Sequence, residues 1–331
     1  MENGIKLDNN DNDTSMKKLI TLCLMVLFAT EIYAERAIQR DEYHYATHDG
    51  QMLYLDRYTS SQCGDSAPCM IFAFGGGFVR GERNHEYYTE YFERLAEAGI
   101  VVVSIDYRLG LKDISAESEL GIRDMVIAMQ RSVDIAVEDL YTATCYVIEH
   151  AAEWGVDSEK IMISGSSAGA ITALQAEWGC CNRSQASQIL PEGFRYAGVV
   201  ACAGAIFSTS GRPKWELSPA PTMLFHGTSD RNVPYRKASI MGIGFYGSEY
   251  IATQLDKMAS PYYFYSVKYA DHAVAVTPLI DQIELILQFI DEYVVEGRRL
   301  CTVTEVESPD VERAPTHFSA KEYLEANYSP R

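Results

Sequence analysis

The chain has 331 residues, of which 47% are hydrophobic and 22% are charged, so it can build a large core and is not intrinsically disordered. Its 28 Lys and Arg residues are outnumbered by 46 Asp and Glu residues, which gives a net charge of −18. Such a surface repels a phosphate backbone, so we expect no nucleic-acid partner. The length allows two domains, but a single large domain is the simpler hypothesis.

The N-terminal segment has the pattern of a secretory signal peptide. Two lysines follow Met16, residues 19–28 form a ten-residue apolar run, and Ala34 ends a cleavage-site pattern. We therefore interpret residues 1–34 as a signal that is translated from Met16 and then removed, and we expect a periplasmic or secreted protein. Ten apolar residues are too few to span a bilayer, which needs about 20, so we expect no stable membrane anchor.

Seven cysteines follow this signal, and an exported protein can form disulfides. Because the number is odd, at least one thiol stays free. Cys63 and Cys69 flank a turn-like segment and form the best candidate disulfide pair. For Cys145 and Cys202, a role as small buried hydrophobic residues is as plausible as a disulfide. No CxxC or HExxH pattern occurs, so the sequence indicates no metal site.

From about residue 42, short apolar runs alternate with amphipathic segments. The runs are rich in β-branched or aromatic residues and do not alternate in polarity, which is typical of strands buried on both faces. They lie at residues 69–74, 100–105, 161–164, 199–205, 222–225 and 262–269. The amphipathic segments have helical spacing and lie at residues 87–98, 138–154, 168–177 and 276–295. This alternation predicts an α/β fold with a mostly parallel central sheet and helices on both faces.

Two segments fall outside this alternation. Residues 109–131 are too long for a simple connection, and we expect an insertion that acts as a lid or a substrate wall. After Gly297 the chain becomes polar and contains three prolines, so we expect residues 298–331 to form a tail outside the core. The main domain then covers residues 35–297, and no pattern specifies an oligomeric state.

The strongest chemical signal is the sequence GSSAG at residues 165–169. It lies between a predicted strand and a predicted helix, which is the strand-turn-helix context of the G-x-S-x-G pattern. Small neighbouring residues let the turn tighten until the side chain of Ser167 stands exposed. We therefore predict that Ser167 is a nucleophile; the alternative is an ordinary glycine-rich turn.

A serine nucleophile needs a histidine base and a carboxylate that orients it. In this fold the chain order is serine, acid, histidine, and only His226, His272 and His317 follow the serine. We predict Asp230 and His272, because each follows a predicted strand at the sheet edge where ligands bind. His226 at the end of an apolar strand fits a structural role, and His317 lies in the predicted tail. Asp271 is a poor partner, because adjacent residues on an extended backbone point apart.

Acyl transfer also needs hydrogen-bond donors for the negative oxygen that develops in the transition state. The triple glycine at residues 75–77 follows a predicted buried strand and offers backbone N–H groups with no side chain in the way. The N–H of Ala168, directly after the nucleophile, is the second expected contributor. A triple glycine alone is more often a flexible turn. Its position after a buried strand and upstream of a serine motif favours a role in binding the negative oxygen.

These motifs together resemble the α/β-hydrolase esterases of the carboxylesterase and hormone-sensitive-lipase-like group, which includes bacterial feruloyl and acetyl esterases. The similarity covers about residues 45–296. It rests on FGGGFVRG (74–81), SIDYRLG (104–110), GVDSEKIMISGSSAGA (155–170), HGTSDRNVPY (226–235) and ADH (270–272). The resemblance implies an α/β-hydrolase fold with a catalytic triad and an oxyanion hole. The triad it implies is Ser167, Asp230 and His272, and the oxyanion hole is formed by the N–H groups of Gly76, Gly77 and Ala168.

The chain departs from the family pattern at two positions. Phe74 stands where the family usually has a histidine before the glycines, and Tyr269 stands where a glycine often precedes the last histidine. The hydrogen bonds that hold the glycine loop must therefore come from elsewhere. We interpret Asp106 and Arg108 as a structural ion pair behind this loop.

We therefore predict a serine hydrolase that cleaves carboxylic esters through an acyl-enzyme intermediate. The resemblance suggests small-molecule or glycan ester substrates, such as acetyl or feruloyl esters on plant-derived glycans, and it implies no cofactor. One alternative is a prolyl-oligopeptidase-like serine peptidase, which shares the fold and the triad order. Another is an inactive binding protein on the same fold.

Overall fold

The computed structural model describes residues 38–114 and 121–328. The predicted signal peptide lies outside these residues. Across the described ranges, none of the helices has both the length and the apolar character that a bilayer crossing requires.

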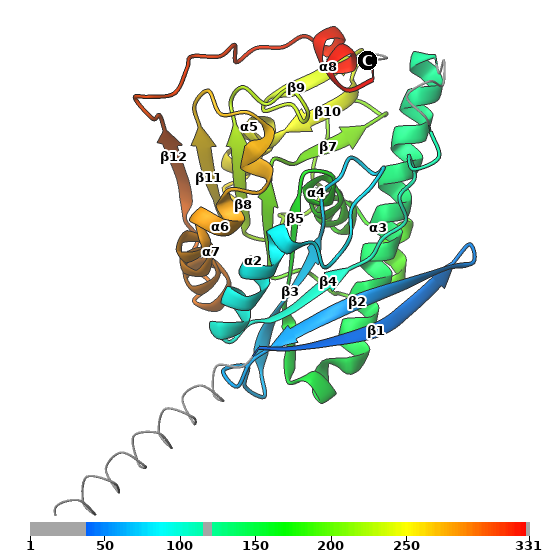
Figure 1. Cartoon of the computed structure of the whole chain (residues 1–331), viewed down its shortest axis with the longest axis vertical. Helices are drawn as coiled ribbons and strands as arrows, with labels where there is room; N and C mark the ends of the chain where they lie inside the picture. The colour runs from blue at the N-terminus through cyan, green and yellow to red at the C-terminus, as the bar shows by residue number, and fades with distance from the viewer. Residues whose placement is uncertain (1–37, 115–120, 329–331) are drawn as a thin grey trace, which may run out of the picture.

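A nine-stranded sheet forms the centre of the molecule (Figure 1). Its strands lie in the order β1-β2-β4-β3-β5-β6-β8-β11-β12. Their bounds are β1 (Gln39–His48), β2 (Gln51–Thr59), β3 (Ala67–Ala73), β4 (Val101–Ile105), β5 (Val156–Ser166), β6 (Gly198–Cys202), β8 (Thr222–Gly227), β11 (Tyr262–Val267) and β12 (Cys301–Val306). The hairpin of β1 and β2 is antiparallel to its neighbour β4, and all pairs from β4 to β12 are parallel. The predicted mostly parallel α/β sheet is confirmed.

Helices cover both faces of this sheet. Figure 1 shows α2, α6 and α7 in front of the sheet, while α3 and α4 pack against each other behind it. Their bounds are α2 (Glu86–Glu97), α3 (Ile122–Trp154), α4 (Ala168–Cys181), α5 (Ser248–Lys257), α6 (Pro278–Asp281), α7 (Ile283–Phe289) and α8 (Ala320–Tyr328). The central strands are buried from both sides, and all five residues of β4 (VVVSI) are inaccessible to solvent. This burial explains why these strands are apolar runs without alternation.

Two predicted elements are each interrupted where the backbone changes conformation. The expected strand over residues 199–205 ends at Cys202, because Ala203 has a positive φ of 53°. The chain then enters a second, three-stranded sheet of β7 (Ala205–Ser208), β10 (Ile243–Gly247) and β9 (Lys237–Ile240). The expected helix over residues 276–295 is divided at Gln282 into α6 and α7 and ends in a π-helical turn at Ile290–Val295.

The predicted insertion over residues 109–131 is not separate from the helix that follows it, although several residues of its second half line the cavity described below. Residues 122–131 are the first turns of α3, which is 33 residues long and begins 16 residues earlier than the predicted helix. Helical spacing of apolar residues continues upstream through Val126, Met129 and Val133, and the last two are buried. Part of the remaining insertion, residues 115–120, lies outside the described residues.

The predicted C-terminal tail is also wrong. Residues Cys301–Val306 form β12, which pairs in parallel with β11 over six residues, from Tyr262 opposite Cys301 to Val267 opposite Val306. Its side chains alternate between exposed and half-buried, as expected of an edge strand with one covered face. The chain then crosses to α8, which lies beside β9. The domain therefore extends beyond residue 297.

The predicted Cys63–Cys69 disulfide is absent. All seven cysteines among the described residues are free thiols. Cys69 is fully buried in β3, whereas the thiol of Cys63 lies in the preceding turn, 3.7 Å from the carbonyl of Ala96 at the end of α2. Cys202 is buried in the core, which agrees with the small hydrophobic alternative for this residue.

Candidate active site

The predicted site residues meet at the carboxyl edge of the central sheet. The strands β3 and β5 are neighbours, and the chain leaves them toward opposite sides of the sheet, which creates a crevice at their carboxyl ends. The glycine loop follows β3, and Ser167 follows β5. Asp230 follows β8 and His272 follows β11, so four parallel strands deliver the four parts of the site to one edge.

Ser167 occupies a strained turn between β5 and α4. Its backbone angles are φ 52° and ψ −115°, outside the regions that a serine normally adopts. The turn is held by the N–H of Ser167, which donates to the carbonyl of Cys202 at 2.9 Å. A Cβ atom at Gly169 would lie 1.9 Å from the carbonyl oxygen of Ala73, and one at Gly165 would lie 2.3 Å from the Gly169 backbone. Both glycines are therefore required for this tight turn.

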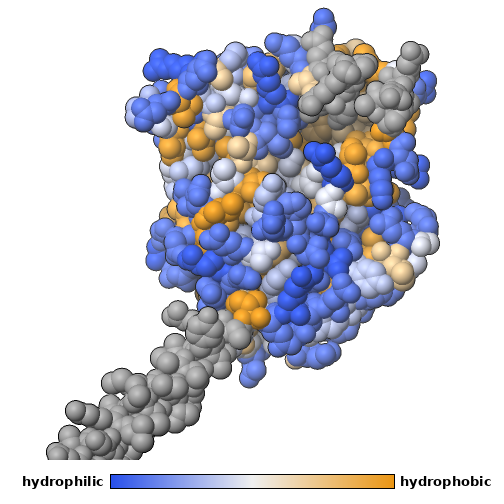
Figure 2. Space-filling view, in the orientation of Figure 1, coloured by the Kyte–Doolittle hydropathy of each residue, from blue (hydrophilic) through white to orange (hydrophobic). Residues whose placement is uncertain are grey.

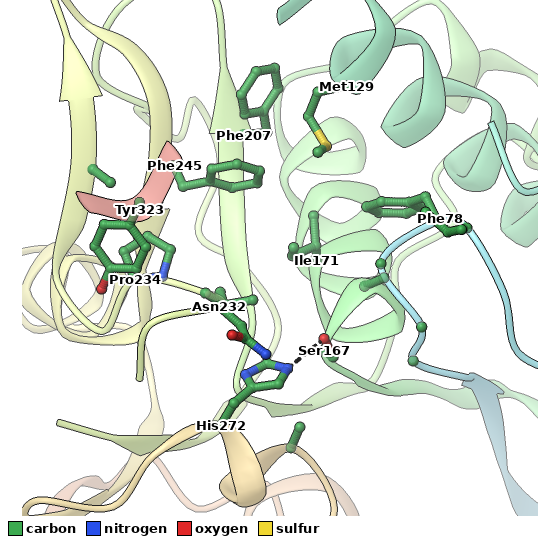
Figure 3. Close-up of a pocket in the computed structure, with 18 of the residues that line it drawn as sticks. Phe78, Met129, Ser167, Ile171, Phe207, Asn232, Pro234, Phe245, His272 and Tyr323 are labelled. Atoms are coloured by element: carbon green, nitrogen blue, oxygen red, sulfur yellow. Dashed lines mark hydrogen bonds between the residues drawn. The ribbon is translucent and has the colours of Figure 1, made fainter. Parts of the chain in front are cut away.

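Ser167, His272 and Asp230 form one continuous chain of hydrogen bonds. The Oγ of Ser167 lies 2.8 Å from Nε2 of His272, as the dashed line in Figure 3 marks. On the other side of the ring, Nδ1 of His272 lies 2.7 Å from Oδ2 of Asp230. The three residues come from separate parts of the sequence, and the geometry matches a nucleophile, a base and an orienting carboxylate.

Asp230 is fully buried yet favours its ionised form. Burial raises the pKa of Asp230, but hydrogen bonds and charge interactions with His226 and His272 outweigh it and hold this pKa well below the usual range. Its other oxygen, Oδ1, accepts from the N–H groups of Asn232 at 2.8 Å and Val233 at 3.0 Å. Because an ionised carboxylate only accepts, Nδ1 of His272 carries the proton and Nε2 is free to accept from Ser167.

His226 also contacts the carboxylate of Asp230, at the same oxygen as His272. The ring is fully buried, and its Nε2 lies 3.2 Å from the carbonyl of Val233 and 3.4 Å from Oδ2 of Asp230. Both atoms are acceptors, so Nε2 carries a hydrogen, while Nδ1 lies 2.7 Å from the hydroxyl of Ser248. His226 therefore has a structural role, as predicted. Its ring stabilises the negative charge of Asp230, the predicted orienting acid.

The glycine loop presents its backbone to the pocket beside Ser167. Gly76 and Gly77 both have positive φ, of 130° and 67°, and a Cβ at Gly76 would lie 1.9 Å from the carbonyl oxygen of Arg80. The N–H of Ala168 is the first of α4, where the helix itself offers no acceptor. All three residues line the pocket with Ser167. The N–H of Gly75, in contrast, already donates to the hydroxyl of Tyr88 at 3.1 Å.

Tyr107 holds the start of the glycine loop through a ring contact and a hydrogen bond, where the resemblance predicted a histidine. Phe74 stacks on Tyr107 with ring centroids 4.4 Å apart, and the hydroxyl of Tyr107 donates to the carbonyl of Phe74 at 2.7 Å. The predicted pairing of Asp106 with Arg108 is wrong, since each pairs elsewhere. Asp106 accepts from Arg83, at the end of the glycine loop, at 2.7 Å. Arg108 binds Asp139 of α3 at 2.9 Å.

A cavity of about 1390 Å³ opens above Ser167. Figure 3 shows that apolar side chains from several elements form its walls. They include Phe78 of the glycine loop, Met129 of α3, Ile171 of α4, Phe207 of β7 and Phe245 of β10. The rings of Phe207 and Phe245 lie 4.8 Å apart. Met129 lies in the segment 109–131 that was predicted to form a lid or a substrate wall, whereas the sequence did not predict the other four wall residues.

The rim of this cavity is also apolar. Figure 2 shows hydrophilic residues over most of one face, with hydrophobic residues gathered near the first turns of α3. Met241, between β9 and β10, is 97% exposed, and Ile122 at the start of α3 is 66% exposed. Both line the cavity. Large exposed apolar groups around a cavity mark a surface that meets an apolar ligand.

Within the described residues, no group of three or more His, Cys, Asp or Glu side chains is arranged to hold a metal ion.

The sheet order, the strained serine turn and the Ser-His-Asp geometry define an α/β-hydrolase fold with the site geometry of a serine hydrolase. Comparison with known proteins agrees with this class. Residues 55–184 match the BD-FAE family model, so this part of the chain is similar to a BD-FAE domain.

Curated relatives match about a third of the chain. The chain is 32% identical over 125 residues to fumonisin B1 esterase from Sphingopyxis macrogoltabida, a match that covers 36% of this chain and 21% of that protein. It is 31% identical over 119 residues to esterase LipI from Mycobacterium tuberculosis, covering 35% and 31%. The chain thus spans less than a third of the length of these two relatives.

Among solved structures, Thermogutta terrifontis esterase 2 aligns with a TM-score of 0.56 and 22% identity, covering 79% of this chain and 96% of that one. This likeness extends over most of the described chain and shows the α/β-hydrolase fold.

Proposed function

We propose that the protein is a carboxylic ester hydrolase with Ser167 as its nucleophile. The observation that carries the proposal is the hydrogen-bond chain from Ser167 through His272 to Asp230 at the floor of the large cavity. The BD-FAE match and the esterase relatives support the same activity.

In this mechanism, the Oγ of Ser167 attacks the ester carbonyl carbon while Nε2 of His272 takes the hydroxyl proton. The carboxylate of Asp230 stabilises the imidazolium that forms. His272 then gives the proton to the departing alcohol, and the acyl group stays on Ser167 as an ester. Water next attacks this acyl enzyme with the same histidine as base, which releases the acid and restores the serine.

The negative oxygen of each tetrahedral intermediate lies beside the glycine loop. We assign its hydrogen-bond donors to the N–H groups of Gly76, Gly77 and Ala168, which are fixed by the backbone before substrate binds. Because the donors are preorganised, they need no rearrangement when the charge develops.

The walls of the cavity suggest the size of the substrate. Ligand pockets usually measure about 300–1,000 Å³, and this one is larger. Of the two acyl groups expected from the family resemblance, we propose the feruloyl group over the acetyl group. The aromatic ring of a feruloyl group would contact Phe207 and Phe245, whereas the methyl group of an acetyl ester is too small to contact them. Attachment of the ester to a plant-derived glycan remains part of this proposal.

Ester hydrolysis by the wild type and by Ser167→Ala tests the activity. We expect the wild type to hydrolyse p-nitrophenyl and feruloyl esters, with acetyl-xylan as the poorer substrate, and Ser167→Ala to lose on the order of 10⁴-fold or more in kcat. Ser158→Ala is the matched control, because Ser158 is an exposed serine at the opposite end of the same strand β5.

Equal activity in the wild type and Ser167→Ala would disprove the mechanism. Cleavage of proline peptides without any ester turnover would instead favour a prolyl-oligopeptidase-like peptidase. A higher kcat/KM for acetyl than for feruloyl esters would disprove only the assignment of the acyl group.

A further inference from the structure

The segment after β12 returns to the site. We call residues 307–328 the C-terminal strap; they include α8. Because β8, β11 and β12 are parallel, the strap leaves β12 at the edge of the sheet where Asp230 and His272 lie. Figure 1 shows it crossing the end of the sheet to place α8 beside β9.

The strap contacts the loop that carries the orienting acid, residues 227–236, at four points along its length. Each point pairs one residue of the loop with one of the strap. The pairs are Ser229 Oγ with the carbonyl of Ala314 (3.4 Å), Arg231 with the ring of Phe318 (4.9 Å), Arg236 with His317 (2.9 Å) and Asp230 with Tyr323. Repeated contact with one loop distinguishes the strap from a segment that only covers surface.

Tyr323 makes the contact nearest to the chemistry. Its hydroxyl donates to the backbone carbonyl of Asp230 at 2.8 Å, and its ring lines the cavity opposite the glycine loop (Figure 3). Burial raises the pKa of Tyr323, so the hydroxyl keeps the hydrogen that it donates. The ring is held in turn by Phe318, at 5.8 Å in an edge-to-face arrangement.

Local sequence fixes where Tyr323 lies on its helix. Ser319 and Glu322 form a capping box at the start of α8, in which the N–H of Ser319 donates to Glu322 at 2.7 Å and the N–H of Glu322 donates to Ser319 Oγ at 3.2 Å. Tyr323 is the next residue, so the capping box fixes its position relative to the loop of residues 227–236.

We propose that Tyr323 is a positioning residue for the hydrolase site, which holds the backbone of Asp230 so that its carboxylate stays aligned on His272. Its ring also closes one side of the cavity. The inference rests on the proposed function. It extends that function to a part of the chain outside the BD-FAE match, which ends at residue 184.

The geometry shows why one hydroxyl matters here. The carboxylate of Asp230 is anchored by the N–H groups of Asn232 and Val233, and its carbonyl is anchored by Tyr323. Without the hydroxyl, a carbonyl in this buried loop loses its partner, which favours a shift of the backbone. Small misplacements of orienting groups reduce turnover, since catalysis depends on the alignment of the reacting groups.

Tyr323→Phe tests the hydroxyl alone, because the ring and its wall remain. We expect kcat to fall roughly three- to tenfold, the range set by one buried hydrogen bond, while KM stays within about twofold. Tyr250→Phe is the matched control: the hydroxyl of Tyr250 also donates to a backbone carbonyl, that of Pro213 at 3.0 Å, but it does not line the cavity. We expect this control to keep the wild-type kcat.

Tyr323→Leu removes the ring as well, so we expect the same loss of kcat together with an increased KM for bulky esters. A second readout needs no substrate: the low-field proton NMR signal of the hydrogen bond between His272 and Asp230. We expect Tyr323→Phe to shift or broaden this signal and Tyr250→Phe to leave it unchanged.

An unchanged kcat and an unchanged signal in Tyr323→Phe would overturn the positioning role. If the wild type hydrolysed no ester, the proposed function would fail, and the NMR comparison would still decide whether Tyr323 aligns Asp230.

Discussion

The glycine loop (residues 74–83) and the acid loop (residues 227–236) serve the same cavity in different ways. Each follows a parallel strand of the central sheet. The glycine loop offers its own backbone, and it is held by Tyr88 and Tyr107, which lie 13 and 33 residues from their partners in the sequence. The acid loop offers one side chain, and its most distant support, Tyr323, lies 93 residues away from Asp230.

The two loops are therefore held in their conformations by different means. Glycines that adopt positive φ define the first loop locally, and only its tethers come from elsewhere. The second loop depends on a carboxylate that stays ionised although it is buried, which requires His226, His272 and backbone N–H groups around it. We therefore expect activity to depend most on charge in the acid loop, where removing the carboxylate should be most harmful. In the glycine loop we expect activity to depend most on backbone conformation.

The largest effect should come from the charge of the acid loop. We expect Asp230→Asn to lower kcat about 10⁴-fold, because an amide in place of the carboxylate favours the wrong tautomer of His272. Steady-state kinetics on a p-nitrophenyl ester measures the effect. The control is Asp271→Asn, since Asp271 is adjacent to His272 but caps the N–H of Ala273 and should be close to wild type. A large loss in this control instead would assign the orienting role to Asp271.

A change of shape in the glycine loop should come second. Gly76→Ala places a Cβ 1.9 Å from the carbonyl oxygen of Arg80 at a φ of 130°, so the loop must move. We expect kcat/KM to fall about 10²–10³-fold, as when an oxyanion donor is lost. Gly193→Ala is the control, because Gly193 also has a positive φ but lies in open space outside the cavity. Wild-type kinetics for a folded Gly76→Ala would exclude this loop as the oxyanion site.

The smallest effect concerns the tethers of the glycine loop. Tyr107→Phe removes the hydrogen bond to the carbonyl of Phe74, and we expect kcat to fall roughly three- to tenfold. Because Tyr107 and Tyr323 support different loops, their losses in the double variant should add to within about 0.5 kcal/mol. Kinetics of the two single variants and the double variant measure this sum. A strong deviation from additivity would show that the two loops move as one unit.

The sequence was sufficient to predict the parallel sheet and the residues that meet in the candidate site. Buried strands such as Val101–Ile105 are continuous apolar runs, and the serine turn requires small residues that stand out as GSSAG. The hairpin of β1 and β2 was missed, although Asp49 and Gly50 at its turn are a strong hairpin signal. The edge strand β12 was missed because it is half exposed and alternates with polar residues.

The supports of the site were harder to predict than its reacting groups. A nucleophile is marked by local geometry, but a tyrosine that anchors a loop is chemically the same as the other tyrosines among the 22 in this chain. Only the fold brings Tyr323 to Asp230 and Tyr107 to Phe74. The walls of the cavity depend in the same way on the second sheet, whose strands pair residues near 205 with residues near 245.

The backbone of Ser167 has a consequence for stability. A non-glycine residue at φ 52° and ψ −115° costs about 1–3 kcal/mol of the free energy of unfolding, and the surrounding core must supply it. A glycine at this position would relieve that strain and remove the proposed nucleophile at the same time. Under the proposed mechanism, stability and activity therefore oppose each other at this residue.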